Sequence, residues 1–187
     1  LPIYDKNGGY TWNWLPFLWQ NGGEFLNDDR TEAVFNSPEG VEALEFWKKM
    51  VQEDKSVPLQ AAPTGVNRFT SGITAMVLDG PWSLNTFLSD PEFKDKFGVA
   101  PLPQKKTRAT VVGGEGVAVF SNTKSPQEAY DYLVHLTCSD FVQTFWENWI
   151  TIPPQPEFKD FYANNSEYGP YIQVISDQME CSRTRPF

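Results

Sequence analysis

The pattern of apolar and polar residues along the chain predicts helices mixed with short strands. Ser37 followed by Pro38 begins the clearest helix, because serine suits the N-cap position and proline suits the first helical position. A capping box from Ser125 to Glu128 begins a second helix, and Ser139 is expected to cap a third. A further helix is expected at residues 171–179.

The apolar positions of these helices predict which sides are buried. In residues 10–20, the aromatic and apolar positions follow helical spacing, with Pro16 in the first turn and Asn21-Gly22-Gly23 at the end. The helix after Ser37 has an apolar face formed by Val41, Leu44, Trp47, Met50 and Val51. The helix after Ser125 carries Ala129, Tyr130, Leu133, Val134 and Leu136, and the helix after Ser139 has Phe141, Val142, Phe145, Trp146 and Trp149 on one side.

Three apolar runs predict strands. Residues 73–78 are almost continuously apolar, which is typical of a strand buried on both faces. Shorter runs at residues 97–102 and 116–120 predict two more, joined by a polar, basic linker at residues 104–110. Strands that alternate with helices predict an α/β fold.

Composition narrows the class of partner. The chain has 187 residues, of which 15% are aromatic, and seven of these are Trp. Flat apolar rings with a polar edge suit surfaces that meet sugars. The net charge of −9 argues against nucleic acid, because phosphate backbones attract clustered Lys and Arg. No apolar run approaches the about 18 residues expected of a membrane-spanning helix.

Few residues indicate catalysis. His135 is the single histidine and lies inside an expected helix, and no Gly-x-Ser-x-Gly elbow is present to use it. Residues 113–116 are too short for a dinucleotide fingerprint and begin an expected strand rather than a helix. Cys138 and Cys181 fit no metal-binding pattern, and the sequence leaves their pairing open. No catalytic residue, cofactor or metal is therefore expected.

A turn at Gly80-Pro81 presents Trp82 directly after the apolar run at residues 73–78. Gly-Pro is a strong turn signal, and ligands usually bind at strand ends in open α/β sheets. Trp82 is therefore a candidate for stacking on a ligand rather than for the core.

Several segments, taken in order, resemble the extracellular solute-binding proteins of sugar transporters, the maltose-binding-protein-like group. These segments are residues 18–23, 35–44, 69–82, 97–103, 113–114 and 125–136, followed by Ile152-Pro153.

The resemblance implies a fold like that of the type II periplasmic binding proteins, in which two α/β lobes close about a hinge on a ligand. Members of the family are longer, so we expect a fragment that lacks the N-terminal half. Residues 1–106 are expected to belong mainly to the second lobe and residues 107–149 to resemble part of the first. Residues 150–187 are expected to return to the second lobe.

The resemblance also implies ligand-binding aromatic residues. In the family, an aromatic residue on the Gly-Pro-Trp turn stacks on a sugar ring, and the matching residue here is Trp82, after Gly80. An aromatic residue before the first Gly-Gly turn corresponds to Trp12 or Trp14.

Polar and glycine positions complete the implied site. A Gly-Gly turn that lets the backbone approach the ligand corresponds to Gly113 and Gly114. The neighbouring Glu115 either accepts hydrogen bonds from sugar hydroxyls or is a solvated loop residue. Arg183 or Arg185 could reach the cleft.

These features predict a binding protein and not an enzyme. It is expected to bind a carbohydrate, most simply an oligosaccharide, outside the cytoplasm and to deliver it to the membrane permease of an ABC transporter. It would be periplasmic, or held at the cell surface as a lipoprotein, without insertion of this segment into the membrane. A phosphorylated polyol ligand, a glycosidase or carbohydrate-binding module, and a structural interaction domain stay open as alternatives.

Overall fold

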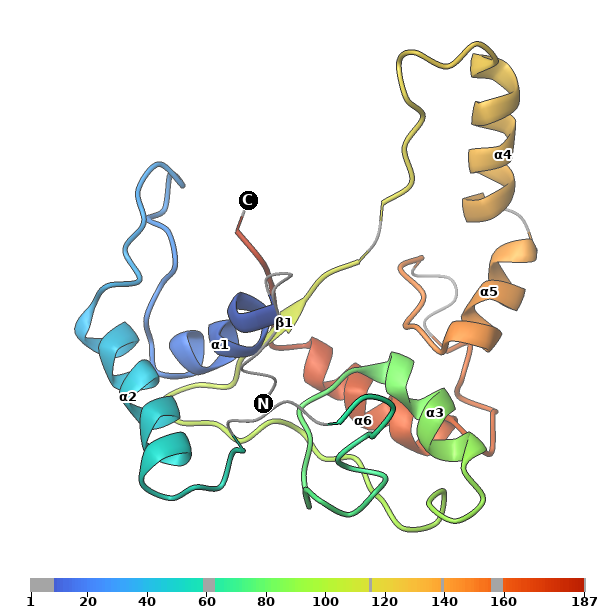
Figure 1. The fold of residues 1–187 in the computed structure, drawn as a ribbon. Helices are drawn as coiled ribbons and strands as arrows, with labels where there is room; N and C mark the ends of the chain where they lie inside the picture. Colours follow the sequence, from blue (N-terminus) through green and yellow to red (C-terminus); the bar gives the residue numbers. More distant parts are fainter. Residues whose placement is uncertain (1–8, 59–62, 115, 139, 156–159, 187) are drawn as a thin grey trace. The chain divides into compact units, whose positions relative to one another are not determined.

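The computed structural model describes residues 9–58, 63–114, 116–138, 140–155 and 160–186 (Figure 1). Its elements are helices, one 3-10 turn and two short strands. In chain order they are α1 (Gly9–Gln20), α2 (Pro38–Gln52), η1 (Pro81–Ser83), α3 (Leu84–Ser89), β1 (Thr110–Val112), α4 (Pro126–Cys138), α5 (Phe141–Trp149), α6 (Gly169–Met179) and β2 (Ser182–Thr184).

The chain divides into two compact units. Unit 1 consists of Leu1–Asp79, Val99–Gly113 and Val174–Phe187, and unit 2 consists of Gly80–Gly98 and Gly114–Gln173. Unit 1 contains α1, α2 and the parallel pair β1–β2, whereas unit 2 contains η1, α3, α4 and α5. The expected lobe boundaries stay a prediction.

Helix α1 forms the centre of the unit 1 core. Leu15 and Leu18 are both 0% exposed. Figure 1 shows α1 beside α2 and β1. The aromatic run is thus a buried helix, as predicted, although Pro16 lies inside it and not in its first turn. The buried cluster consists of Trp14, Leu15, Leu18, Trp19, Ala43, Trp47 and Ala109.

Helix α1 ends in a glycine turn, as predicted. The N–H of Gly22 donates to the carbonyl of Trp19 at 2.9 Å, and the N–H of Gly23 donates to the carbonyl of Leu18 at 3.0 Å. Gly22 has a φ of 84°, a left-handed conformation that glycine adopts most readily. This Schellman arrangement satisfies two carbonyls of the last turn.

Helix α2 begins at the predicted residues. Ser37 occupies the N-cap position, and its Oγ accepts a hydrogen bond from the N–H of Gly40 at 3.2 Å. Pro38 is the first helical residue, where its missing N–H costs nothing because that group would have no partner within the helix.

The buried side of α2 differs in part from the prediction. Val41 and Leu44 are 46% and 51% exposed. Small residues decide the side, because a Cβ on Gly40 would collide with the backbone carbonyl oxygen of Phe35. The helix therefore approaches the neighbouring backbone closely at Gly40, and this contact sets which side is buried. Its buried residues are Gly40, Ala43 and Trp47.

The three predicted strands are wrong. No described residue of segments 73–78, 97–102 and 116–120 belongs to a strand, and Met76 is 86% exposed. The strands lie instead at the end of the expected linker and in the C-terminal tail, where Thr110 is opposite Ser182. A strand is defined by hydrogen bonds to a neighbouring strand, and an apolar run alone cannot provide that neighbour.

Aromatic rings build the core of unit 2. Phe87 contacts Phe93 and Phe97 edge-on, with ring centroids 5.9 and 5.4 Å apart. Phe97 stacks on Tyr171 at 5.0 Å. Other buried residues of this unit are Leu84, Val142, Trp146, Ile150, Tyr162 and Ile172.

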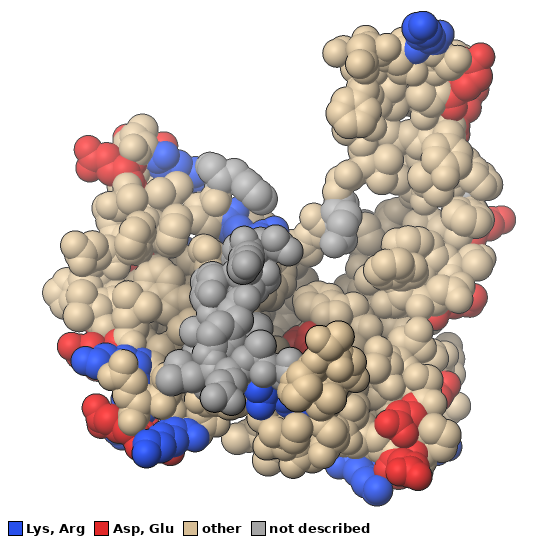
Figure 2. Space-filling model, viewed as in Figure 1, with Lys and Arg blue, Asp and Glu red and all other residues tan. Residues whose placement is uncertain are grey.

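Helices α4 and α5 expose much of their apolar sides. No described residue of α4 is buried, whereas α5 buries Val142 and Trp146. Most of the surface over these helices in Figure 2 carries neither basic nor acidic side chains. Asp140 is the N-cap residue of α5, whereas the predicted cap, Ser139, lies outside the described residues.

Two further sequence expectations concern membranes and cysteines. In the part of the chain that the structure describes, every helix is too short or too polar to cross a membrane. Cys138 is exposed, Cys181 is half-buried, and both are free thiols.

Replacing Gly40 by alanine should lower the free energy of unfolding by about 1–3 kcal/mol, because the added methyl must displace the Phe35 carbonyl. The matched variant Gly98→Ala adds a methyl where no atom lies within 4 Å. It should change the free energy of unfolding by less than about 0.5 kcal/mol. Urea unfolding followed by tryptophan fluorescence measures both, and equal effects would contradict the packing assigned to Gly40.

Candidate functional site

Residues from three distant parts of the sequence meet in unit 1, and we call them the Trp12 cluster: Trp12, Gly113 and Arg185. The guanidinium carbon of Arg185 lies 5.0 Å from the centroid of the Trp12 ring. A Cβ added to Gly113 would lie 2.9 Å from Cζ3 of Trp12 and 3.7 Å from Nη2 of Arg185. Trp12 and Gly113 are thus brought together with Arg185, which the sequence offered as the alternative to Arg183.

The short sheet explains how this cluster forms. Strands β1 and β2 are parallel, with Val112 opposite Thr184. Gly113 and Arg185 are the next residues of each chain segment, so both leave the sheet at the same end. Helix α1 is tied to the beginning of β1, because Nε2 of Gln20 donates to the carbonyl of Ala109 at 2.8 Å.

A second arginine–tryptophan pair repeats the arrangement. Arg183 lies 4.7 Å from the centroid of the Trp19 ring. Trp12 and Trp19 are seven positions apart and therefore lie on one side of α1, while Arg183 and Arg185 lie on one side of an extended segment. In the sequence these residues form a Trp-x6-Trp pattern within a helix and an Arg-x-Arg pattern near the C-terminal strand. Only the structure shows that the two patterns meet.

The two arginines differ in how their charge is compensated. Two guanidinium nitrogens of Arg183 donate to the two carboxylate oxygens of Glu24, at 3.0 and 2.5 Å. Arg185 forms no ion pair within the described ranges of the chain. Its Nε is buried without a hydrogen-bond partner. The predicted residue Arg183 is therefore neutralised, and its neighbour Arg185 carries the unpaired charge.

Trp14, the alternative to Trp12, lies in the core. It is 8% exposed and contacts Phe35 edge-on, with ring centroids 6.1 Å apart. Residues two positions apart on a helix point in different directions, so Trp12 and Trp14 cannot both face the end of the sheet. Trp12 is the partly exposed one.

The predicted Gly-Pro-Trp turn lies in unit 2. Trp82 belongs to η1 and is 48% exposed. A Cβ on Gly80 would collide with the Trp82 ring, so the ring rests against that glycine. Gly114 is exposed and also belongs to unit 2, whereas Glu115 lies outside the described residues.

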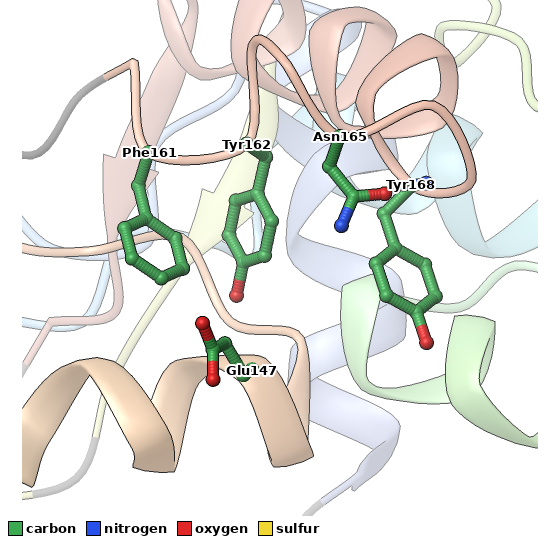
Figure 3. A pocket seen from close by; sticks show the side chains of 5 residues that line it. All are labelled: Glu147, Phe161, Tyr162, Asn165 and Tyr168. Carbon is green, nitrogen blue, oxygen red and sulfur yellow. Dashed lines mark hydrogen bonds between the residues drawn. The ribbon is translucent and has the colours of Figure 1, made fainter.

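Unit 2 also contains a hollow of about 320 Å³ that the sequence did not indicate. Figure 3 shows Phe161 and Tyr162 pointing from a loop toward α5, which carries Glu147. The loop residues that line it are Phe161, Tyr162, Asn165 and Tyr168.

Tyr162 anchors this loop to α5. It is 3% exposed, and its hydroxyl donates to the backbone carbonyl of Trp146 at 2.7 Å. Burial raises the pKa of Tyr162 to about 12. The phenol therefore stays protonated near neutral pH and serves as a hydrogen-bond donor.

Metal binding finds no support in the described ranges. They contain no group of three or more His, Cys, Asp or Glu side chains that could hold a metal ion.

A family profile gives these residues their context. The profile described as bacterial extracellular solute-binding protein matches residues 5–169. The chain therefore belongs to the bacterial extracellular solute-binding proteins, which confirms the predicted family.

Relatives of known name extend the comparison. A protein of Brucella abortus (strain 2308) is 28% identical over 167 residues, which are 86% of this chain and 40% of the relative. A protein of Rhizobium radiobacter named lactose-binding protein is 27% identical over 131 residues, which are 67% of this chain and 31% of the relative. The chain thus spans less than half the length of these relatives.

Solved structures show the same fold. The cyclic alpha-maltosyl-1,6-maltose binding protein from Arthrobacter globiformis is 28% identical and matches 98% of this chain and 46% of its own, with a TM-score of 0.69. A solute-binding protein from Thermotoga lettingae, bound with alpha-D-tagatose, is 26% identical and matches 94% of this chain and 46% of its own, with a TM-score of 0.78. The predicted α/β binding-protein fold class is confirmed.

The variant Tyr162→Phe should lower the free energy of unfolding by about 0.5–1.5 kcal/mol, because it removes a buried hydrogen bond. It should also change the pH dependence. The folded-state pKa of Tyr162 is about 12, above the usual 10.0, so the unfolded state loses this proton first and stability falls as pH rises between these values. Urea titrations between these pH values should show a smaller fall for the variant than for the parent, and identical slopes would contradict the assignment.

Proposed function

We propose that the protein binds a carbohydrate and that the Trp12 cluster forms part of its site. The observation that carries the proposal is the convergence of a partly exposed indole, a guanidinium and a glycine backbone at one end of the sheet. Sugar rings present apolar C–H faces and polar hydroxyl edges. An aromatic ring suits the first and charged hydrogen-bond donors suit the second.

Glycine at position 113 supports this reading. A side chain there would strike Trp12, so the lack of one leaves the indole in place and the backbone exposed. We propose that Gly114 continues this exposed backbone. Glu115 stays a candidate for accepting hydrogen bonds from sugar hydroxyls.

Trp82 supplies a second candidate stacking surface, in unit 2. It is 48% exposed, and a half-exposed indole can offer a ring face to a sugar. The Trp82 ring packs against Gly80, where the missing side chain leaves room for it. Trp14 and Arg183 receive supporting roles in this proposal, because one is buried in the core and the other is paired with Glu24.

We further propose that the protein works outside the cytoplasm and delivers its ligand to the permease of an ABC transporter. The family description and the ligand named for the Rhizobium radiobacter relative support this role. Binding without turnover is the proposed activity, and the family consists of binding proteins. Screening the protein at its natural full length against a glycan array tests the proposal, and hydrolysis of a bound glycan would instead indicate a glycosidase.

Replacing Trp12 by alanine, or Trp82 by alanine, should weaken binding of the saccharide selected by the array by about 1–3 kcal/mol, because each variant loses a ring contact. Trp149→Ala is the matched control, since Trp149 is 61% exposed on α5 and has no proposed ligand role. Isothermal titration calorimetry measures the affinities. Equal effects of all three variants would contradict the assignment.

Gly113→Ala should weaken the same binding about tenfold, because the new methyl pushes the Trp12 ring from its position. Gly116→Ala adds a methyl with no atom within 4 Å and should leave the affinity unchanged. Circular dichroism verifies that both variants fold. Unchanged affinity in a folded Gly113→Ala protein would remove this residue from the site.

A further inference from the structure

The two arginine–tryptophan pairs of unit 1 can be compared with each other. Each guanidinium lies over an indole of α1, at 4.7 Å for Arg183 and Trp19 and at 5.0 Å for Arg185 and Trp12. The distance from guanidinium to ring is therefore similar in the two pairs. They differ in the carboxylate, since Glu24 pairs with Arg183 through both of its oxygens.

Packing alone does not account for the uncompensated charge of Arg185. The chain contains 24 acidic and 15 basic residues, so acidic side chains are the more abundant partners. Nevertheless, Arg185 has no ion-pair partner in the described parts of the chain, although its side chain is partly buried. Burial raises the cost of leaving a charge unpaired, and even the more exposed Arg183 is paired with a carboxylate.

The nitrogens of Arg185 are not equally accessible. Nε is buried and has no hydrogen-bond partner, so a ligand would reach the terminal nitrogens. Nη2 lies 3.7 Å from the position that a Cβ on Gly113 would occupy, and that position lies 2.9 Å from the edge of the Trp12 ring. A ligand over the exposed backbone of Gly113 can thus contact the indole edge and the guanidinium together.

We propose that the ligand is an acidic saccharide whose carboxylate binds Arg185 while its sugar ring contacts Trp12. This inference rests on the proposed carbohydrate-binding function and specifies its ligand class as an oligosaccharide that contains a uronic acid. At Arg185, the carboxylate of the uronic acid would play the part that the Glu24 carboxylate plays at Arg183. Guanidinium groups bind carboxylates through paired, charge-assisted hydrogen bonds, which adds orientation as well as affinity.

The experiment uses the protein at its natural full length and an array with three arms. The arms carry neutral galactose and glucose oligosaccharides, the corresponding galacturonate and glucuronate oligosaccharides, and 6-sulfated or 6-phosphorylated versions. Titration calorimetry then compares the best uronate with its neutral counterpart. The variants are Arg185→Gln, which removes the charge, Arg185→Lys, which keeps it, and Arg108→Gln, a control that removes one exposed positive charge from the same unit.

The parent protein should prefer uronate oligosaccharides. Arg185→Gln should weaken uronate binding about 10- to 100-fold and neutral binding less than about threefold. Arg185→Lys should retain part of the preference, and Arg108→Gln should retain all of it. Raising the salt concentration should reduce the uronate preference of the parent.

Three results would overturn the inference. They are a preference for neutral sugars, a preference for sulfate or phosphate esters, and a uronate preference that survives in a folded Arg185→Gln protein. In each of these cases carbohydrate binding itself would stand. Failure to bind any glycan on the array would instead refute the proposed function, and the inference with it.

Discussion

Burial of helix α1 is the constraint on which unit 1 depends. Leu15 and Leu18 are fully buried, and α2 and the segment before β1 pack around them. The polar end of the helix is equally fixed. Gln20 donates to the carbonyl of Ala109, and Nδ2 of Asn21 donates to the carbonyl of Glu39 and to the Glu42 carboxylate, each at 2.8 Å. A buried amide that lost such partners would cost about 1–3 kcal/mol, so these contacts fix the helix in position as well as in burial.

The position of α1 determines where the candidate site forms. Once Gln20 has fixed α1 against the beginning of β1, the parallel register places Gly113 and Arg185 at one end of the sheet, near the N-terminal part of the helix. Trp12 lies on the same side of α1 as Trp19 because the two residues are seven positions, about two helical turns, apart. The site is therefore a consequence of core packing. Substitutions in the core that shift α1 would displace the indole without touching any residue of the cluster.

The sequence predicted helices better than strands for a physical reason. Helix ends are specified by neighbouring residues, such as Ser37 and Pro38 at the start of α2 and Gly22 after α1, and the structure contains both. The pair β1–β2 instead joins residues about 70 positions apart, and each strand is only three residues long. The sequence also could not predict which side of α2 is buried, because this depends on how closely the Phe35 carbonyl approaches Gly40.

The candidate site shows the same division between local and distant determinants. Trp12 and Gly113 could be selected from the sequence as an aromatic platform and a bare backbone, since those properties belong to each residue alone. The charge at the site could not be selected in this way. Arg183 and Arg185 are equivalent by residue type and by position on one side of an extended segment, and Glu24, 159 positions from Arg183, makes them different. Because one carboxylate neutralises only the nearer guanidinium, tertiary structure turns a repeated Arg-x-Arg pattern into one supporting arginine and one that can bind an anion.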